Sequence, residues 1–233
     1  MFGTTVNGLV ILVTGSLGCL IKKAIPEKIE KPMMDMVGLS VALIALLGFF
    51  STALTVENGA IKSNGEIMML VCLALGIAIG ELLHIDDRIN AWGAKIEAKA
   101  GVDGFAKGFV TASLIFCVGA MAIFGALKDG ISGDSSVLIV KSMIDAITAF
   151  ILGSSMGIGV AFAGVSVFVY QGIIALLASF IQPFMTDTMM MNICTVGYAI
   201  VFVIGTNMLG LTKVKLANTL PAIVLSVIYT LLF

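Results

Sequence analysis

The chain has 233 residues, of which 59% are hydrophobic and only 12% are charged. Soluble domains carry about 25% charged residues, so a soluble chain of this length could not hide so much apolar surface from water. The net charge of −1 offers no basic face for nucleic acid, and the hydrophobicity excludes intrinsic disorder. The composition therefore predicts an all-α integral membrane protein, with a single transmembrane helical domain over residues 1–233.

Eight apolar segments follow one another along the chain, divided by charged or turn-rich stretches. They cover about 2–21, 33–54, 67–85, 109–127, 137–152, 158–182, 189–209 and 216–233. The first is not a signal peptide, because its basic residues, Lys22 and Lys23, come after the apolar run. About eight transmembrane helices are expected.

The longest polar stretch, residues 86–107, separates the third and fourth segments. Ile89, Trp92 and Ile96 recur in it at helical spacing, with basic residues between them. This pattern predicts an amphipathic helix on the cytoplasmic surface, with Trp92 at the level of the lipid headgroups. A solvated connector is the alternative interpretation.

The fifth and sixth segments have no charged loop between them. Val137–Phe184 holds 48 residues, enough for two spans, and its only interruption is the glycine- and serine-rich Gly153–Gly159. Glycine disfavours continuous helix, so this interruption is either a turn at the membrane surface or a break inside the membrane.

Basic residues predict the orientation. With the N-terminus outside, ten of the 13 lysines and arginines fall in inner loops, namely Lys22, Lys23, Lys28, Lys31, Arg88, Lys95, Lys99, Lys107, Lys213 and Lys215. Only Lys62 and Lys128 fall in outer loops, and Lys141 lies within the fifth segment. The positive-inside rule therefore predicts eight spans with both termini outside.

A short internal similarity raises the hypothesis of an inverted repeat. Lys31–Asp35 resembles Lys141–Asp145, and the two copies open the second and fifth segments. Copies three spans apart have opposite orientations, as in inverted-repeat transporters. A chance match of five residues is the alternative.

Six stretches spread over the whole chain resemble a bacterial membrane protein family, domain of unknown function 554 (the YqgA/YdfK-like proteins). They are Gly80–Ile85, Gly108–Met121, Lys141–Asp145, Tyr170–Gly172, Asn207–Gly210 and Ala217–Ala222. The resemblance implies a multi-pass protein of the bacterial inner (plasma) membrane. It implies no reaction or substrate, so no functional residue is carried over from the family.

Ionisable side chains inside the spans are the main functional clue. Asp145 lies eight positions into the fifth segment, about 12 Å deep, where a charge costs several kcal/mol unless it is paired or hydrated. Lys141 lies four residues earlier and therefore shares its helix face. The pair predicts an ion, proton or substrate site, and a neutralised pair that joins two helices is the alternative.

Other polar and small residues are candidates for the same pathway. Gln171 lies near mid-bilayer beside Tyr170, where both side chains could bind solute or hydrogen-bond a neighbouring helix. Gly157 and Gly159 precede the sixth segment and could expose backbone dipoles at the same depth. Secondary candidates, each with an interfacial or interhelical alternative, are Asp35, Glu81, Asn192 and Asn207.

No enzyme, cofactor or metal is expected. The four cysteines all lie within apolar runs without a CxxC pair, and they are Cys19, Cys72, Cys117 and Cys194. Glu81 and His84 have a metal-binding spacing, but the chain has no second histidine to complete such a site. Metalloprotease and serine hydrolase motifs are missing from the sequence.

The leading hypothesis is a transporter or channel for a small polar or ionic solute, with its pathway along the fifth and sixth segments and the second segment as a further candidate. A membrane scaffold or partner subunit is the competing class, and an intramembrane enzyme is a weaker third. The expected partners are the lipid bilayer, the solute and further copies of the chain in a homo-oligomer, and no nucleic acid is expected.

Overall fold

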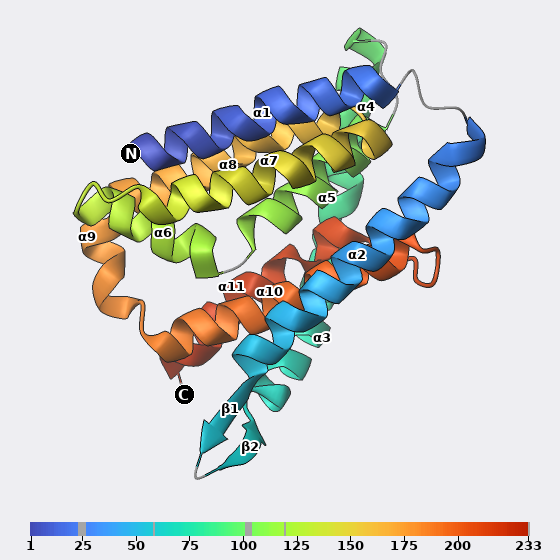
Figure 1. The fold of residues 1–233 in the computed structure, drawn as a ribbon. Helices are drawn as coiled ribbons and strands as arrows, with labels where there is room; N and C mark the ends of the chain where they lie inside the picture. The colour runs from blue at the N-terminus through green and yellow to red at the C-terminus, as the bar shows by residue number, and fades with distance from the viewer. Residues whose placement is uncertain (23–26, 58, 101–103, 119, 233) are drawn as a thin grey trace. The chain divides into compact units, whose positions relative to one another are not determined.

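The computed structural model describes residues 1–22, 27–57, 59–100, 104–118 and 120–232. The helices and strands, in chain order, are α1 (Phe2–Lys22), α2 (Glu27–Ala53), β1 (Leu54–Glu57), β2 (Ala60–Ser63), α3 (Glu66–Leu82), α4 (Ile85–Ala100), α5 (Phe105–Cys117), α6 (Ala120–Ile131), α7 (Ser136–Met156), α8 (Gly159–Leu176), α9 (Ala178–Ile181), η1 (Gln182–Phe184), α10 (Asp187–Met208), η2 (Leu216–Thr219) and α11 (Leu220–Leu232) (Figure 1). Helices dominate the described residues, which confirms the all-α class.

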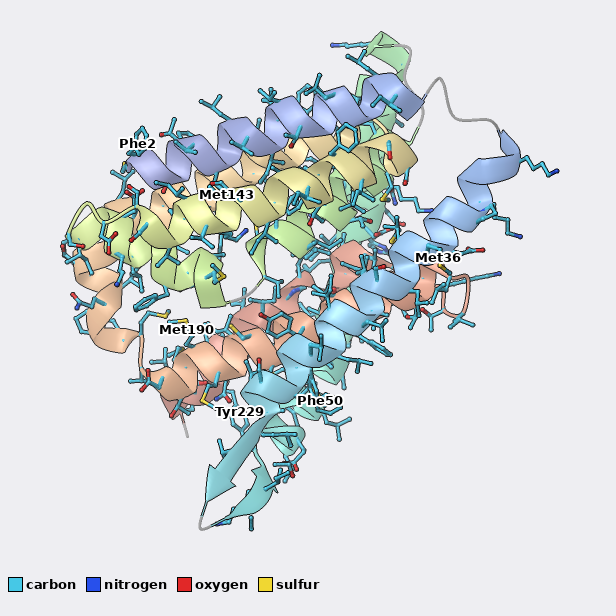
Figure 2. All side chains as sticks on the ribbon, in the orientation of Figure 1. Phe2, Met36, Phe50, Met143, Met190 and Tyr229 are labelled. Carbon is cyan, nitrogen blue, oxygen red and sulfur yellow. The ribbon has the colours of Figure 1, made fainter. Side chains whose placement is uncertain are left out.

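Five described helices are long and apolar enough to cross a membrane alone, and two bent helix pairs raise the number to seven. The apolar stretch Leu216–Leu232 is shorter than a full span. Large apolar side chains such as Phe2, Phe50 and Met143 are exposed and project from their helices (Figure 2). Exposed apolar surface on most helices is typical of contact with lipid, and the chain is therefore a multi-pass membrane protein.

The fourth predicted span, expected as one helix over residues 109–127, is broken. α5 ends at Cys117, α6 begins at Ala120, and the two helices meet at an angle of 67°. Val118, just past the end of α5, has an extended backbone, and its N–H still bonds to the carbonyl of Leu114. Valine and glycine at 118 and 119 are both weak helix formers, which permits the break without explaining it.

The interruption expected at Gly153–Gly159 is shorter than the sequence suggested. α7 continues as regular helix through Met156, and only Gly157 and Ile158 separate it from α8. Gly157 has a φ of 86°, a conformation that glycine adopts far more easily than other residues. It therefore forms a tight turn between two separate helices.

The loops also depart in part from expectation. The polar stretch after α3 forms the helix α4, as predicted, and Trp92 packs on Phe105 and Phe109 with ring centroids 5.9 and 5.7 Å apart. Its position at the headgroups stays a prediction.

The β1–β2 hairpin was not predicted, because its ten residues were read as part of a helix and an outer loop.

Contacts divide the chain into two compact units, residues 1–37 with 89–183 and residues 38–88 with 184–233. The predicted single domain stays a prediction. In the second unit α2 packs on α10, where Ala42 meets Gly205 and the Thr195 hydroxyl donates to Thr52 at 2.9 Å. α3 packs on α11 through Gly76 and Ala222. Small residues at both contacts let the backbones approach closely.

In the first unit α1 and α7 run parallel. Gly3 at the start of α1 lies against Leu138, and Gly18 near its end lies against Phe150 and Ser154. Two parallel membrane helices must have an odd number of crossings between them. α2, α3 and the broken α5–α6 pair supply three, so the count agrees with α5–α6 as one span and with α4 outside the bilayer.

The parallel packing of α1 on α7 yields a stability prediction at Gly153. A Cβ atom added there would collide with the carbonyl oxygen of Gly15, so Gly153→Ala must push the two helices apart. We expect a loss of about 1–3 kcal/mol in unfolding free energy, measured by thermal unfolding in detergent. Gly172→Ala is the control, because its Cβ would meet only the end of the Met1 side chain at 3.6 Å. Equal stability of the two variants would contradict the observed packing.

Candidate functional site

The candidate site is built around an ion pair on α7. Lys141 and Asp145 lie one helical turn apart, and the lysine Nζ donates directly to the aspartate carboxylate. Both residues are only 6% exposed. Asp145 lies about 14 Å along a helix that is long and apolar enough to span the membrane, so the pair is inside the bilayer.

Two amide side chains join this pair from neighbouring helices. Asn7 of α1 donates through Nδ2 to Gln171 Oε1 of α8 at 3.3 Å, and both residues are fully buried. Asn7 is also close enough to the Asp145 carboxylate to interact with it. Within the described residues, Asn7 Oδ1 and Gln171 Nε2 have no hydrogen-bond partner. Buried polar atoms are rarely left without a partner, so these two atoms are available to bind a water molecule, an ion or a solute.

The helix break lies beside the same pair. Cys117, the last residue of α5, is close enough to interact electrostatically with both Lys141 and Asp145. The last carbonyl groups of a helix and the first N–H groups of the next lack helical partners, so the break exposes backbone dipoles here. The central cluster is defined here as Asn7, Cys117, Lys141, Asp145 and Gln171.

Gly157 and Gly159, which were also predicted for the pathway, lie away from the central cluster. Gly157 lies twelve residues beyond Asp145, about 18 Å along α7, and Gly159 packs against the backbone of Phe105 and Phe109. The expectation that these glycines share the depth of Asp145 is therefore wrong. Tyr170 is half-buried and adjacent in sequence to Gln171, which places it on a different part of the α8 surface.

Three of the four secondary candidates form polar contacts with neighbouring residues that the structure describes. Asn207 holds the turn after α10, donating to the Val214 carbonyl at 2.7 Å. Asn192 donates to Thr230 at 2.9 Å, and Asp35 is half-buried on α2. Glu81 lies 3.6 Å from the Lys215 ammonium at an exposed surface of the second unit.

Lys215 also contacts a second carboxylate in this surface network. Its ammonium donates to Asp87 at 3.2 Å, and this hydrogen bond and charge lower the pKa of Asp87 and raise that of Lys215. Asp87 also lies 3.4 Å from His84 Nδ1. His84 therefore pairs with an acid in this network, and the described residues hold no cluster of three or more metal-ligating side chains.

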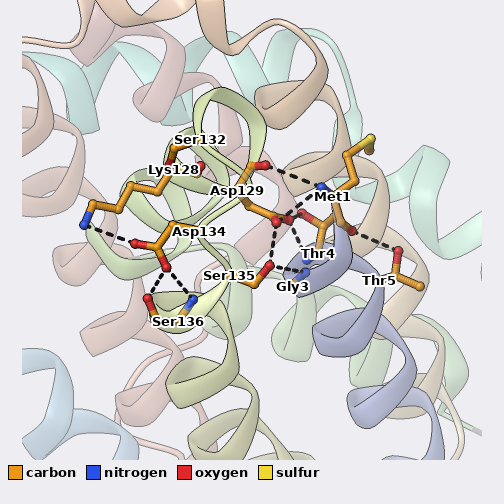
Figure 3. Close-up of polar contacts among 10 residues, drawn as sticks. All are labelled: Met1, Gly3, Thr4, Thr5, Lys128, Asp129, Ser132, Asp134, Ser135 and Ser136. Carbon is orange, nitrogen blue, oxygen red and sulfur yellow. Dashed lines mark hydrogen bonds and ion pairs between the residues drawn. The ribbon is translucent and has the colours of Figure 1, made fainter.

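Sequence reasoning missed a buried carboxylate at the end of α6 (Figure 3). The Asp129 side chain is fully buried and accepts hydrogen bonds from the Thr4 N–H at 3.1 Å, the Thr4 hydroxyl at 3.0 Å and Ser135 at 2.7 Å. The Met1 amine lies 3.2 Å from the same carboxylate. Asp129 thus ties the starts of α1 and α7 to the end of α6. Asp129 was not predicted as a buried residue, because the sequence predicts that an outer loop begins at Lys128.

A polar hollow in the second unit was also missed. Its volume is about 760 Å³, and it lies where α3 and α10 begin. Hydroxyl and amide side chains dominate its polar lining, including Thr52, Asn64, Thr186, Asn192 and Thr230. Single threonines scattered over four segments give no recognisable pattern in a sequence.

Known proteins resemble this chain along nearly its whole length. The family model described as "Protein of unknown function (DUF554)" matches residues 2–231. "Uncharacterized membrane protein YdfK" of Bacillus subtilis (strain 168) is 29% identical over 225 residues, which cover 97% of this chain and 93% of the relative. "Uncharacterized protein YqgA" of Escherichia coli (strain K12) is 30% identical over 233 residues, with 97% and 94% covered. No solved structure matches the chain. The resemblance inferred from the sequence motifs is confirmed.

Proposed function

The chain belongs to the DUF554 family of proteins of unknown function, and we propose that it is a transporter or channel for a small polar or ionic solute. It works in the bacterial inner membrane, as a homo-oligomer, and moves its solute past the central cluster without converting it. The observation that carries this proposal is the helix break at Cys117 beside the buried Lys141–Asp145 pair.

Two energetically unfavourable features, a buried ion pair and a helix break, coincide at the central cluster. Charged side chains in hydrocarbon cost several kcal/mol, and backbone groups freed by a broken helix cost about as much unless they find partners. Discontinuous helices with ionisable side chains at the same depth are typical of the solute sites of transporters. A protein that only scaffolds has no need for both features together.

The atoms left without partners separate the proposal from its main alternative. A structural ion pair that joins helices is expected to have every polar neighbour satisfied. Asn7 Oδ1 and Gln171 Nε2 are fully buried without partners among the described residues, which favours a site that a solute or water occupies.

The proposed topology has both termini outside and α4 on the cytoplasmic side. The ten-to-two distribution of basic residues between inner and outer loops supports it. The parallel course of α1 and α7 is consistent with the eight-span count on which that distribution depends.

The native cysteine at the break tests whether the cluster is reached by water. In a variant with Cys19, Cys72 and Cys194 replaced by alanine, a membrane-impermeant methanethiosulfonate reagent should modify Cys117 in membrane vesicles. We expect a rate at least about tenfold above that of a matched variant that retains only Cys194, because thiols packed away from water react slowly. Cys194 is the control because it is buried in the other unit.

A sidedness control uses Lys95→Cys in a chain without other cysteines. It should react in inverted vesicles and stay unmodified in intact cells, and modification in intact cells would refute the topology. If Cys117 is as unreactive as Cys194 in both vesicle orientations, water does not reach the central cluster. A membrane scaffold or partner subunit would then replace the transporter as the proposed function.

A further inference from the structure

We infer that the central cluster binds a small monovalent cation at Asp145, in place of the Lys141 ammonium. The inference rests on the proposed function and names the class of its solute. The Lys141 ammonium already occupies a cation position, since it is held by the Asp145 carboxylate within a nearly closed site.

Only the cationic partner of this pair is able to withdraw. Lysine has four rotatable side-chain bonds and lies five residues from the start of α7, so its ammonium is able to swing toward the near end of the helix. Aspartate has a short side chain and stays where the backbone holds it. A soluble anion would have to displace Asp145 from the lysine, whereas a soluble cation needs only to replace a mobile ammonium.

Several of the surrounding atoms are oxygen ligands suited to an alkali cation. The Asp145 carboxylate supplies the charge, and Asn7 Oδ1 is a fully buried acceptor with no partner in the described part of the chain. The carbonyl end of α5 lies nearby, since Cys117 interacts with both members of the pair. Helix C-terminal carbonyls at a break are recurrent ligands for such ions in membranes.

Charge balance favours a monovalent ion over a divalent ion at this site. A single carboxylate neutralises one positive charge, so a divalent ion would leave the site with an uncompensated charge in hydrocarbon. When the cation enters, the Lys141 ammonium moves toward the near end of α7, so that one positive charge replaces another beside the carboxylate.

Few other charged groups near the pair are available to bind or repel the cation. α1 and α8 face it with the uncharged amides of Asn7 and Gln171, and α5 contributes the Cys117 thiol. Asp129 lies at the far end of α6, in the separate group of polar contacts shown in Figure 3.

Protection of Cys117 from the same thiol reagent tests the inference. Labelling of the variant that keeps only Cys117 is followed in chloride salts of sodium, lithium, potassium and choline at equal ionic strength, and in sodium gluconate. We expect at least one alkali cation to slow labelling by about threefold or more relative to choline, while exchange of chloride for gluconate has no effect. In proteoliposomes that contain a cation-sensitive dye, a gradient of that cation should drive its uptake.

Lys141→Met supplies a second measurement. Without the competing ammonium, the cation concentration that half-protects Cys117 should fall by about tenfold or more. Rates that respond to the anion and not to the cation would overturn the inference and indicate an anion site. If Cys117 is labelled at a rate that responds to neither ion, the cation site is refuted, but the proposed solute pathway is not. Failure of the reagent to reach Cys117 at all would defeat the proposed function itself.

Discussion

Asp145→Asn should reduce cation uptake into proteoliposomes at least about 100-fold, because a neutral amide no longer balances the charge of a cation bound inside the membrane. The substitution keeps the size and shape of the side chain, so the packing of α7 against α1 and α8 should survive. It removes the carboxylate that contacts Lys141, and with it the charge that holds the cation. Dye fluorescence after a cation jump, corrected for the amount of folded protein, measures the effect.

Two further variants test the role of the lysine and control for the loss of an aspartate. Lys141→Met should retain part of the activity, because Asp145 still supplies the charge that holds the cation. Equal damage from both substitutions would indicate that the pair acts as one unit. Asp134→Asn is the matched control, since this aspartate precedes the same helix but is exposed and paired with Ser136 and Lys128. Asp134→Asn should transport as the wild type does.

The structural alternative predicts a different pattern for the same variants. If Lys141 and Asp145 only join helices, Asp145→Asn should lower the yield of folded protein and the unfolding temperature, without a specific defect in transport. Wild-type cation uptake by a well-folded Asp145→Asn protein would therefore refute the role that we assign to the carboxylate.

The sequence identifies the spans well and the central cluster only in part. Apolar length is a local property, so α1, α7, α8 and α10 appear close to their expected positions. The ion pair was also predictable, because residues four apart in a helix share a face whatever surrounds them. Asn7 is not among the predicted pathway residues, and its partner Gln171 lies 164 residues away. Which distant amide meets which carboxylate is decided by tertiary packing.

The position of the helix break could not be predicted for a related reason. Glycine and serine are enriched at Gly153–Gly159, where only two residues leave the helix, whereas the real break beside the cluster has valine and glycine alone. Both residues are common within membrane helices. Propensity near position 118 permits either a straight or a broken helix, and the choice depends on neighbouring helices.

Asp129→Ala should destabilise the first unit more than any substitution outside the central cluster that we consider. Its carboxylate is fully buried and accepts three hydrogen bonds, from the backbone N–H and the hydroxyl of Thr4 and from Ser135. Hydrogen bonds to a charged group contribute roughly 1.5–3 kcal/mol each, and removing the acceptor leaves buried donors without a partner. We expect a loss of roughly 3 kcal/mol or more in unfolding free energy, measured by thermal unfolding in detergent.

Asp134→Ala is the control for this prediction, because Asp134 lies in the same turn, bonds to Ser136 and is exposed. Hydrogen bonds from Ser136 and the nearby charge of Lys128 lower the pKa of Asp134, but solvent screens these interactions. Its substitution should leave the unfolding temperature nearly unchanged. Asp129 ties together the helix ends of α1, α6 and α7, whereas Asp145 lies near the middle of α7, so transport per folded molecule should be preserved in Asp129→Ala. An Asp129→Ala protein as stable as Asp134→Ala would show that the contacts in Figure 3 contribute little. A stable Asp129→Ala protein that fails to transport would instead move Asp129 into the pathway.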